Sequence, residues 1–433
     1  MMDLADLSKV IDQFDSSTLT PEQLFGLAVP LVQRLNSGDE PKIAWCLAIA
    51  ILAELNEIEM SFQLLSAAAG KFEHPAILCC QICDWLLRDR KYQAIANIHG
   101  GASADSIPRF ISSYYMACVS FAKDNPKEAF TYLETFRQTP AALRDLLLVH
   151  HDLNIMFRQG CLVRPPDHID ALLAAPPAVP FSRMDFVRTA IPPGGGERPI
   201  FMCSADKKYL NALLRRFLDE LPNGPADIIL VAVNIDADDM TLIDELRSAH
   251  PQYRIDVVAI DSEHRNATFY ACARFYALQA ILPRYRRPVV SLDIDCVLTI
   301  EGRHLLEQPF PDVDFACYRS TRDEPASYFQ AGIMYWAATP QAREFLDLVC
   351  LFCAERAAEN SRVTWMLDQA ALFSVLYYAH RRKRGLRFVP LNQLTGKTLP
   401  EMTIDTWDGP ASKGNLRGVS VSSTQAGLIF VED

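Results

Sequence analysis

The spacing of hydrophobic residues changes once along this chain of 433 residues, and that change limits what the chain can fold into. From residue 1 to about residue 160, alanine, leucine, isoleucine and aromatic residues recur every three or four positions, as in amphipathic helices. From residue 197 onwards, short apolar runs alternate with helical stretches, which predicts an α/β fold. A chain of this length exceeds one hydrophobic core, so we expect two domains.

Three segments of the first part resemble one another, and each joins two expected helices through a short polar turn. They are LAELNEIEMSFQLL, LLRDRKYQAIANI and FAKDNPKEAFTYL. Their corresponding small residues, Ser61, Ala94 and Ala129, are 33 and 35 positions apart, close to the tetratricopeptide period of about 34 residues. We therefore expect residues 1–160 to form an all-α, tetratricopeptide-like domain. Such a domain either offers a concave surface to a protein partner or acceptor, or only stabilises or dimerises the chain.

Proline and glycine are concentrated in residues 161–196, for example in APPAVP and IPPGGGERP. Proline removes backbone donors and glycine adds flexibility, so we expect a linker there, with a domain boundary near Gly194 to Gly196. The α/β domain is then expected to span residues 197–433.

Composition excludes several classes of protein. The formal net charge of −11 argues against a general nucleic-acid-binding protein, which needs basic surface to neutralise phosphates. No uncharged apolar run reaches the length of a transmembrane helix, and the first residues lack a secretory signal, so we expect a cytoplasmic protein.

The twelve cysteines include CQIC and CLFC in helix-like sequence. Buried, reduced thiols are the expected state, with a zinc site as the alternative.

The strand ends of the α/β part are where ligands are expected, because such sheets bind ligands beyond the carboxyl ends of their strands. The expected strands lie in RPIFMCSA, ADIILVAVNI, YRIDVVAI and RPVVSLDIDCVL. In the last of these, Asp293 and Asp295 are two residues apart and face one side of a strand, while Ile294 faces the core. Two adjacent carboxylates there are unfavourable unless a cation joins them, and Mn²⁺ or Mg²⁺ suits carboxylate oxygens. A solvated turn with two aspartates is the alternative.

The second half resembles the GT-A-fold nucleotide-diphospho-sugar glycosyltransferases, in particular the glycogenin-like and lipopolysaccharide-galactosyltransferase-like group. The resemblance covers about residues 198–410 and rests on CSADKKYLNALLRRFL, FYACARFYALQAIL, RRPVVSLDIDCVL, YFQAGIMYW and WMLDQAALFSVLYY. It implies a Rossmann-like, mostly parallel sheet. It also implies metal-dependent transfer of a sugar from a nucleoside diphosphate sugar, expected to be a UDP-sugar, to an acceptor, with Mn²⁺ or Mg²⁺ as cofactor.

By this resemblance, several residues contact the nucleotide part of the donor. Ala205 and Asp206 contact the base, and Tyr209 stacks on it. Arg274 approaches the diphosphate or Asp293. Two alternatives remain open: Asp206 could cap the helix that follows it, and Arg274 could be an exposed helix charge.

The resemblance also assigns the sugar site. Gln330, where the family usually has Asn, closes that site together with Ala331 and Gly332. Asp368 binds a sugar hydroxyl or the acceptor, and Gln369 lies near the anomeric carbon; the alternative for this pair is a helix cap. Asp-Gln and F-x-A-G elements are similar to those of retaining enzymes, so we expect retention.

The final motif of the family, H-x-x-G-x-x-K, corresponds loosely to DTWDGPASKGN, which lacks the histidine. Here Asp408 would supply the third metal oxygen and Lys413 a phosphate contact; an ordinary surface loop is the alternative.

The missing histidine and Gln330 also leave open a different class of function, a repeat-based scaffold with an inactive transferase-like domain. A nucleotidyltransferase would normally show a glycine-rich loop after the first strand, and CSADKKY has none.

One strongly basic run, HRRKRGLR at residues 380–387, follows an apolar helix in this otherwise acidic chain. Cations at the end of a helix suit its dipole, which favours a solvated surface. An anionic lipid surface or an acidic acceptor is the alternative partner.

Overall fold

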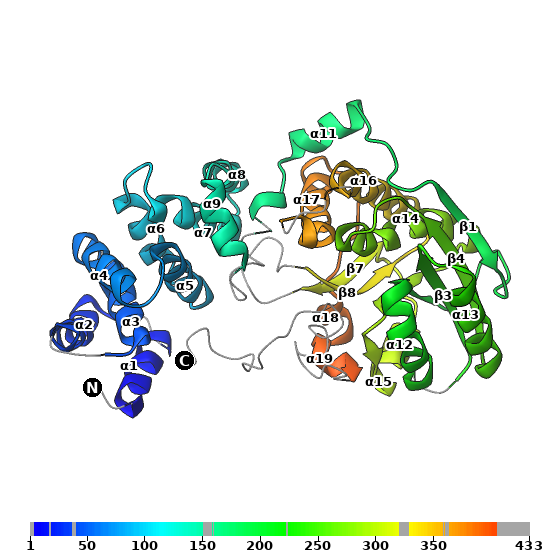
Figure 1. The fold of residues 1–433 in the computed structure, drawn as a ribbon, viewed down its shortest axis with the longest axis horizontal. Helices are drawn as coiled ribbons and strands as arrows, with labels where there is room; N and C mark the ends of the chain where they lie inside the picture. The colour runs from blue at the N-terminus through cyan, green and yellow to red at the C-terminus, as the bar shows by residue number, and fades with distance from the viewer. Residues whose placement is uncertain are drawn as a thin grey trace. The chain divides into compact units, whose positions relative to one another are not determined.

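The computed structural model describes residues 4–16, 19–36, 40–149, 158, 160–221, 224–319, 329–357, 359 and 363–404. Contacts divide these residues into two compact units, residues 4–161 and residues 162–404 (Figure 1). Within these ranges no helix combines the length and apolar character needed to cross a membrane.

The described part of the first unit is helical throughout. Several helices that follow one another in the chain pack against each other, notably α3 with α4 and α7 with α8. The helices are α1 (Leu4–Ser16), α2 (Pro21–Leu35), α3 (Lys42–Glu54), α4 (Ile58–Lys71), α5 (Pro75–Arg88), α6 (Tyr92–Gly101), α7 (Ile107–Ala122), α8 (Pro126–Arg137) and α9 (Ala141–Val149).

Three turns of this unit, which join α3 to α4, α5 to α6 and α7 to α8, have the same geometry. Each contains one residue in the left-handed region: Asn56, Arg90 and Asp124, with φ of 63°, 57° and 53°. In each, the next amide donates to a carbonyl five residues earlier, at 2.7–2.8 Å, which closes the helix end in a Schellman motif. The left-handed residues are spaced 34 positions apart. Ser61, Ala94 and Ala129 are buried just inside the following helices.

The second unit is built on a mixed, mostly parallel sheet with the strand order β1-β4-β3-β2-β5-β8-β7. The parallel strands are β2 (Ile200–Asp206), β3 (Ala226–Val233), β4 (Tyr253–Asp261) and β5 (Val289–Asp293). Antiparallel strands extend both edges: β1 (Arg183–Arg188) pairs with β4, while β8 (Phe329–Trp336) pairs with β5 and β7 (Phe315–Arg319). A separate pair consists of β6 (Val297–Leu298) and β9 (Thr403–Ile404).

Helices cover both faces of this sheet (Figure 1). On one face, α12 (Lys207–Glu220) and α13 (Ala237–Ala249) pack leucines, isoleucines and phenylalanine against β2, β3 and β4. On the other lie α14 (Ala267–Tyr285), α16 (Pro340–Arg356) and α17 (Leu367–Arg381). Because the parallel strands are covered on both sides, β3 is buried along its whole length. The remaining elements are α11 (Pro166–Ala174), α15 (Ile300–Leu306), η1 (Val363–Met366), α18 (Leu391–Thr395) and α19 (Leu399–Met402).

The segment expected to be a linker, residues 161–196, belongs to the second unit from residue 162 onwards. It contains α11, which packs on α16 and α17, and the edge strand β1. Buried Asp256 of β4 explains the placement, because its carboxylate accepts hydrogen bonds from the amides of Ala190 and Ile191 and from the hydroxyl of Tyr285. Proline and glycine composition therefore did not identify a free linker here, since the segment's donors find acceptors on a distant strand.

Replacing Asp256 by alanine is expected to lower the free energy of unfolding of the second unit by about 2–4 kcal/mol. The amide of Ile191 and the hydroxyl of Tyr285 would lose a buried, charged acceptor, and each loss costs about 1–3 kcal/mol. Hydrogen exchange in β4 during urea titration measures the effect. Asp185→Ala on the exposed face of β1 is the matched control and is expected to change stability by less than about 0.5 kcal/mol. Equal effects of the two variants would contradict this account.

Candidate functional site

The parallel strands bring the predicted donor-site residues to one edge of the sheet. Ser204 of β2 is paired in register with Asp293 of β5, so Asp206 and Asp293 both lie where their strands end. These strands form because almost every position is apolar and buried between the two helix layers. Their carboxyl ends therefore meet at one place, as the sequence predicted.

Arg274 of α14 joins two predicted carboxylates at this edge. Its Nη1 donates to Asp293 Oδ1 at 2.6 Å and to the carbonyl of Ala331 at 3.1 Å. Its Nη2 donates to Asp368 Oδ2 at 2.9 Å, and its Nε donates to the carbonyl of Ala271 at 2.9 Å. The side chain is only 8% exposed, so Arg274 is not the exposed helix charge considered as its alternative. Residues from α14, β5, β8 and α17 thus meet at one guanidinium.

The protonation states of this cluster follow from burial and charge together. Burial by itself lowers the pKa of Arg274, but the Asp293 and Asp368 carboxylates outweigh it and hold its pKa above the usual value. Burial raises the pKa of Asp368, and this effect exceeds the opposing influence of Arg274 and of the Gln369 amide. Arg274 therefore stays charged and supplies the cation that balances the neighbouring carboxylates.

Asp293 and Asp295 are positioned differently from the expected strand geometry. The strand β5 ends at Asp293, and the chain then turns, with the amide of Cys296 donating to the carbonyl of Asp293 at 2.9 Å. Ile294 is buried in the core, as predicted, whereas Asp295 is half-buried within the turn. The two carboxylates are thus presented by a strand end and its following turn, not by one strand face.

A bulge in β8 lies beside Asp293. Gln330 pairs with Tyr318 of β7 whereas Met334 pairs with Cys317, so three residues of β8 have no partner on that side. Those residues include Ala331, whose carbonyl binds Arg274, and Gly332. A Cβ on Gly332 would lie 3.6 Å from Asp293 Oδ2. Bulges are common beside active sites because they redirect a strand locally. Gln330 itself is exposed at the start of the bulge.

Asp368 and Gln369 lie in the first turn of α17, as predicted, but neither is its N-cap, which is Met366. Asp368 Oδ1 accepts a hydrogen bond from the Gln369 amide at 2.9 Å, while Oδ2 binds Arg274. The helix therefore begins at the site and fixes Asp368 from both sides.

A polar pocket of about 410 Å³ opens beyond the ends of β2 and β3. Asp206 lines this pocket and also caps α12, since its Oδ1 accepts from the Tyr209 amide at 2.9 Å. The helix-cap alternative for Asp206 is therefore correct as a description of its local bond, and the residue still faces the pocket. Ala205 is buried, and Tyr209 packs against the core. The pocket is lined by Asp206, Lys207, Lys208, Asn211, Val233, Asn234, Arg265 and Tyr270.

Most residues of this pocket were missed by sequence analysis. Lys207 is bound to Asp236 of the next helix, and Asn234 adopts a left-handed conformation with its Oδ1 accepting from the Ser262 amide. No ion pair involves Lys208 or Arg265 within the ranges described above, so both cations remain available to a ligand. Asn234 follows the apolar run of β3 directly, and the rule of inspecting every strand end would have found it.

The remaining predicted residues, Asp408 and Lys413, lie outside the described residues. In the part of the chain that the structure describes, no group of three or more His, Cys, Asp or Glu side chains could hold a metal ion. The carboxylates of Asp293 and Asp295 lie at the end of β5 and in the turn that follows it.

No family model matches the chain, and no curated protein matches it. Among solved structures, the apo-form glycosyltransferase GlyE of Streptococcus pneumoniae TIGR4 is 18% identical, with a TM-score of 0.30; the alignment covers 46% of each chain. The galactosyltransferase LgtC in complex with donor and acceptor sugar analogs is 16% identical, also with a TM-score of 0.30, over 40% of this chain and 70% of that one. The chain thus spans less than half the length of GlyE. A TM-score of 0.30 is too low for either similarity to carry an inference about function.

Proposed function

We propose that this chain is a metal-dependent glycosyltransferase that moves a sugar from a nucleoside diphosphate sugar, a UDP-sugar, to an acceptor. The supporting observation is the buried Arg274, which binds both Asp293 and Asp368 at the carboxyl edge of the sheet. The pocket beyond the ends of β2 and β3 carries Lys208 and Arg265, for which the described residues supply no ion pair. Buried charges with altered pKa values next to an open polar pocket are typical of functional sites.

The residues at the strand end fit a divalent cation. Mg²⁺ and similar ions keep several waters and are held by one or two carboxylates together with substrate phosphates. Asp293 and Asp295 would hold Mn²⁺ or Mg²⁺, with Asp408 as the further proposed ligand. Asp293 Oδ1 is engaged by Arg274, which leaves Oδ2, on the side of Gly332, for the ion. The bound ion would neutralise charge on the departing diphosphate.

The chain's own residues then bind and orient the donor. Lys208 and Arg265 attract its phosphates electrostatically, and Asp206 supplies an acceptor group for the base, with Ala205 and Tyr209 beside it. Arg274 binds Asp293 and Asp368 and fixes both side chains in position.

At the other side of the site, Asp368, Gln369 and Gln330 are proposed to contact the sugar and the acceptor, with retention of configuration. Asp368 is held on two sides, so it can position a hydroxyl without reorganisation. Lys413 is the proposed further phosphate contact.

Calorimetric titration of UDP in the presence and absence of Mn²⁺ tests this function. Binding is expected to require Mn²⁺, and the Lys208→Ala, Arg265→Ala double variant is expected to bind UDP about 10–100-fold more weakly. Removing two cations near a diphosphate loses about 1–3 kcal/mol of charge-assisted interaction. The control is the Arg215→Ala, Arg343→Ala double variant, which removes two exposed cations away from the pocket.

Absence of UDP binding in the wild-type protein, with and without Mn²⁺, would overturn the proposed donor. The competing function, a helical-repeat scaffold with an inactive transferase-like domain, would then be favoured.

For the first unit we propose a tetratricopeptide-like array that holds a protein partner or acceptor. The support is its three turns of equal geometry, which are spaced 34 residues apart.

A further inference from the structure

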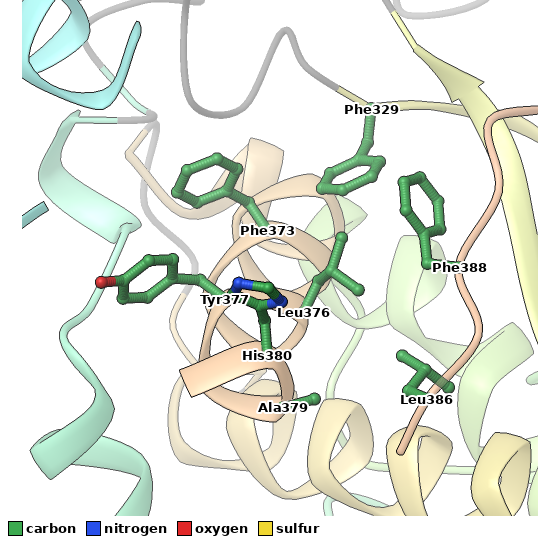
Figure 2. Close-up of a pocket in the computed structure, with 8 residues that line it drawn as sticks. All are labelled: Phe329, Phe373, Leu376, Tyr377, Ala379, His380, Leu386 and Phe388. Atoms are coloured by element: carbon green, nitrogen blue, oxygen red, sulfur yellow. The ribbon is translucent and has the colours of Figure 1, made fainter. Parts of the chain in front are cut away.

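A second pocket, of about 310 Å³, lies between β8, α17 and the segment that follows α17. Phe329, Phe373 and Phe388 converge on it, and Leu376 lies between them (Figure 2). The ring centroids of Phe329 lie 5.6 Å from Phe388 and 6.4 Å from Phe373. Apart from Tyr377 and His380, its lining is apolar, and it opens to solvent. An apolar pocket that is lined by aromatic side chains and opens to solvent is typical of a ligand site.

Cations border this apolar pocket on one side. A contiguous pocket of about 460 Å³ shares Ala379, His380 and Leu386 with it and adds Arg381, Lys383 and Gly385. Lys383 and Gly385 have φ of 51° and 70°, so the chain reverses there and carries the basic residues around the end of α17.

The basic run divides into paired and unpaired cations. Arg382 binds Asp170, Arg384 binds Glu344, and Arg387 binds Asp314 and Asp312. By contrast, Arg381 and Lys383 have no ion-pair partner within the described ranges, and both are exposed. The unpaired cations are the two that line the contiguous pocket, where an anionic group could bind them.

The apolar pocket is close to the candidate functional site. Phe329 precedes Ala331 by two residues on β8, which corresponds to about 7 Å of strand. Phe373 follows Asp368 by five residues on α17, which corresponds to about 7.5 Å of helix. The same two elements therefore carry the Arg274 contacts and the aromatic lining.

We propose that these two contiguous pockets bind an anionic amphiphile, with its apolar chain among the three phenylalanines and its anionic group at Arg381 and Lys383. A volume of 310 Å³ is at the lower end of the range of small-molecule sites, so it fits one alkyl chain rather than a protein surface. On the proposed transferase function, on which this step rests, the amphiphile is the acceptor, held beside the sugar site.

Calorimetric titration with alkyl phosphates of increasing length, below their micelle concentrations, tests the pocket. Affinity is expected to rise about fourfold per methylene from hexyl phosphate and to stop rising near decyl phosphate, because each buried methylene contributes about 0.8 kcal/mol until the pocket is full. A Leu376→Trp variant, which partly fills the pocket, is expected to reach this plateau at a shorter chain. No binding, or affinity that rises without a plateau in both proteins, would overturn the proposal.

The cationic rim is tested with decyl phosphate on the Arg381→Gln, Lys383→Gln double variant. Affinity is expected to fall about fivefold for each cation at low salt and less at high salt. Binding of decanol is expected to stay unchanged, as is binding of decyl phosphate to the Arg215→Ala, Arg343→Ala control. Equal losses of decyl phosphate affinity in the variant and the control would contradict the assignment. Tighter binding of a short acidic peptide that contains phenylalanine than of decyl phosphate would also contradict it.

Failure of this inference is distinguishable from failure of the proposed function. If UDP binds with Mn²⁺ but decyl phosphate does not bind, the amphiphile site is wrong and the transferase proposal stands. If decyl phosphate binds as expected but UDP does not bind, the amphiphile site stands and its role as an acceptor site is wrong.

Discussion

Replacing Arg274 by methionine is expected to lower the free energy of unfolding of the second unit by about 3–5 kcal/mol. The variant keeps an unbranched side-chain stem but removes the guanidinium, which leaves Asp368, whose side chain is 8% exposed, without its buried cation. Removing one partner of a buried ion pair is costly because the remaining charge stays in a poorly solvated place. Urea denaturation, with hydrogen exchange in α14 and α17 to assign the transition to this unit, measures the loss.

A double variant separates charge from packing in this cluster. Adding Asp368→Asn to Arg274→Met removes the uncompensated charge and is expected to restore about 1–2 kcal/mol. If Arg274→Met alone changes stability by less than about 1 kcal/mol, or if Asp368→Asn lowers it further, the guanidinium does not hold this site together.

Replacing Asp293 and Asp295 together by asparagine is expected to lower the rate of sugar transfer by about 10³-fold or more and to abolish Mn²⁺-dependent UDP binding. Asparagine preserves shape and an oxygen that can accept from Arg274, but it removes both anionic ligands. Loss of preorganised charge stabilisation at one contact costs about 10²–10³-fold in rate, and here two carboxylates are removed. Transfer from UDP-sugars, with UDP release as the readout, and calorimetry with UDP measure the two effects.

The matched control is Asp145→Asn on the exposed surface of α9 in the first unit, which is expected to leave both quantities unchanged. If the Asp293→Asn, Asp295→Asn variant binds UDP with the same Mn²⁺ dependence as the wild-type protein, the ion is not held at this strand end.

The sequence alone indicated the four parallel strands of the α/β unit and the helices between them, but not β1 or β7. Runs such as ADIILVAV and IFMCSAD are mostly apolar, and a strand buried on both faces accommodates such a run. The expected mostly parallel sheet follows from the alternation of such runs with helices. The strand-end rule then located Asp206 and Asp293, whereas Asp368 on α17 was assigned only through the resemblance to the glycosyltransferase family.

Contacts between distant segments decided the rest. Whether Arg274 faces solvent or two carboxylates depends on how α14 packs against β5 and α17, and nothing local to its helix specifies that. Residues 162–196 resemble a linker in composition, but Asp256 holds them on the sheet from about 65 residues away. The aromatic pocket likewise needs Phe329, Phe373 and Phe388 from three segments. Local pattern specifies which face a residue presents, whereas the partner that meets that face is chosen only when the whole chain packs.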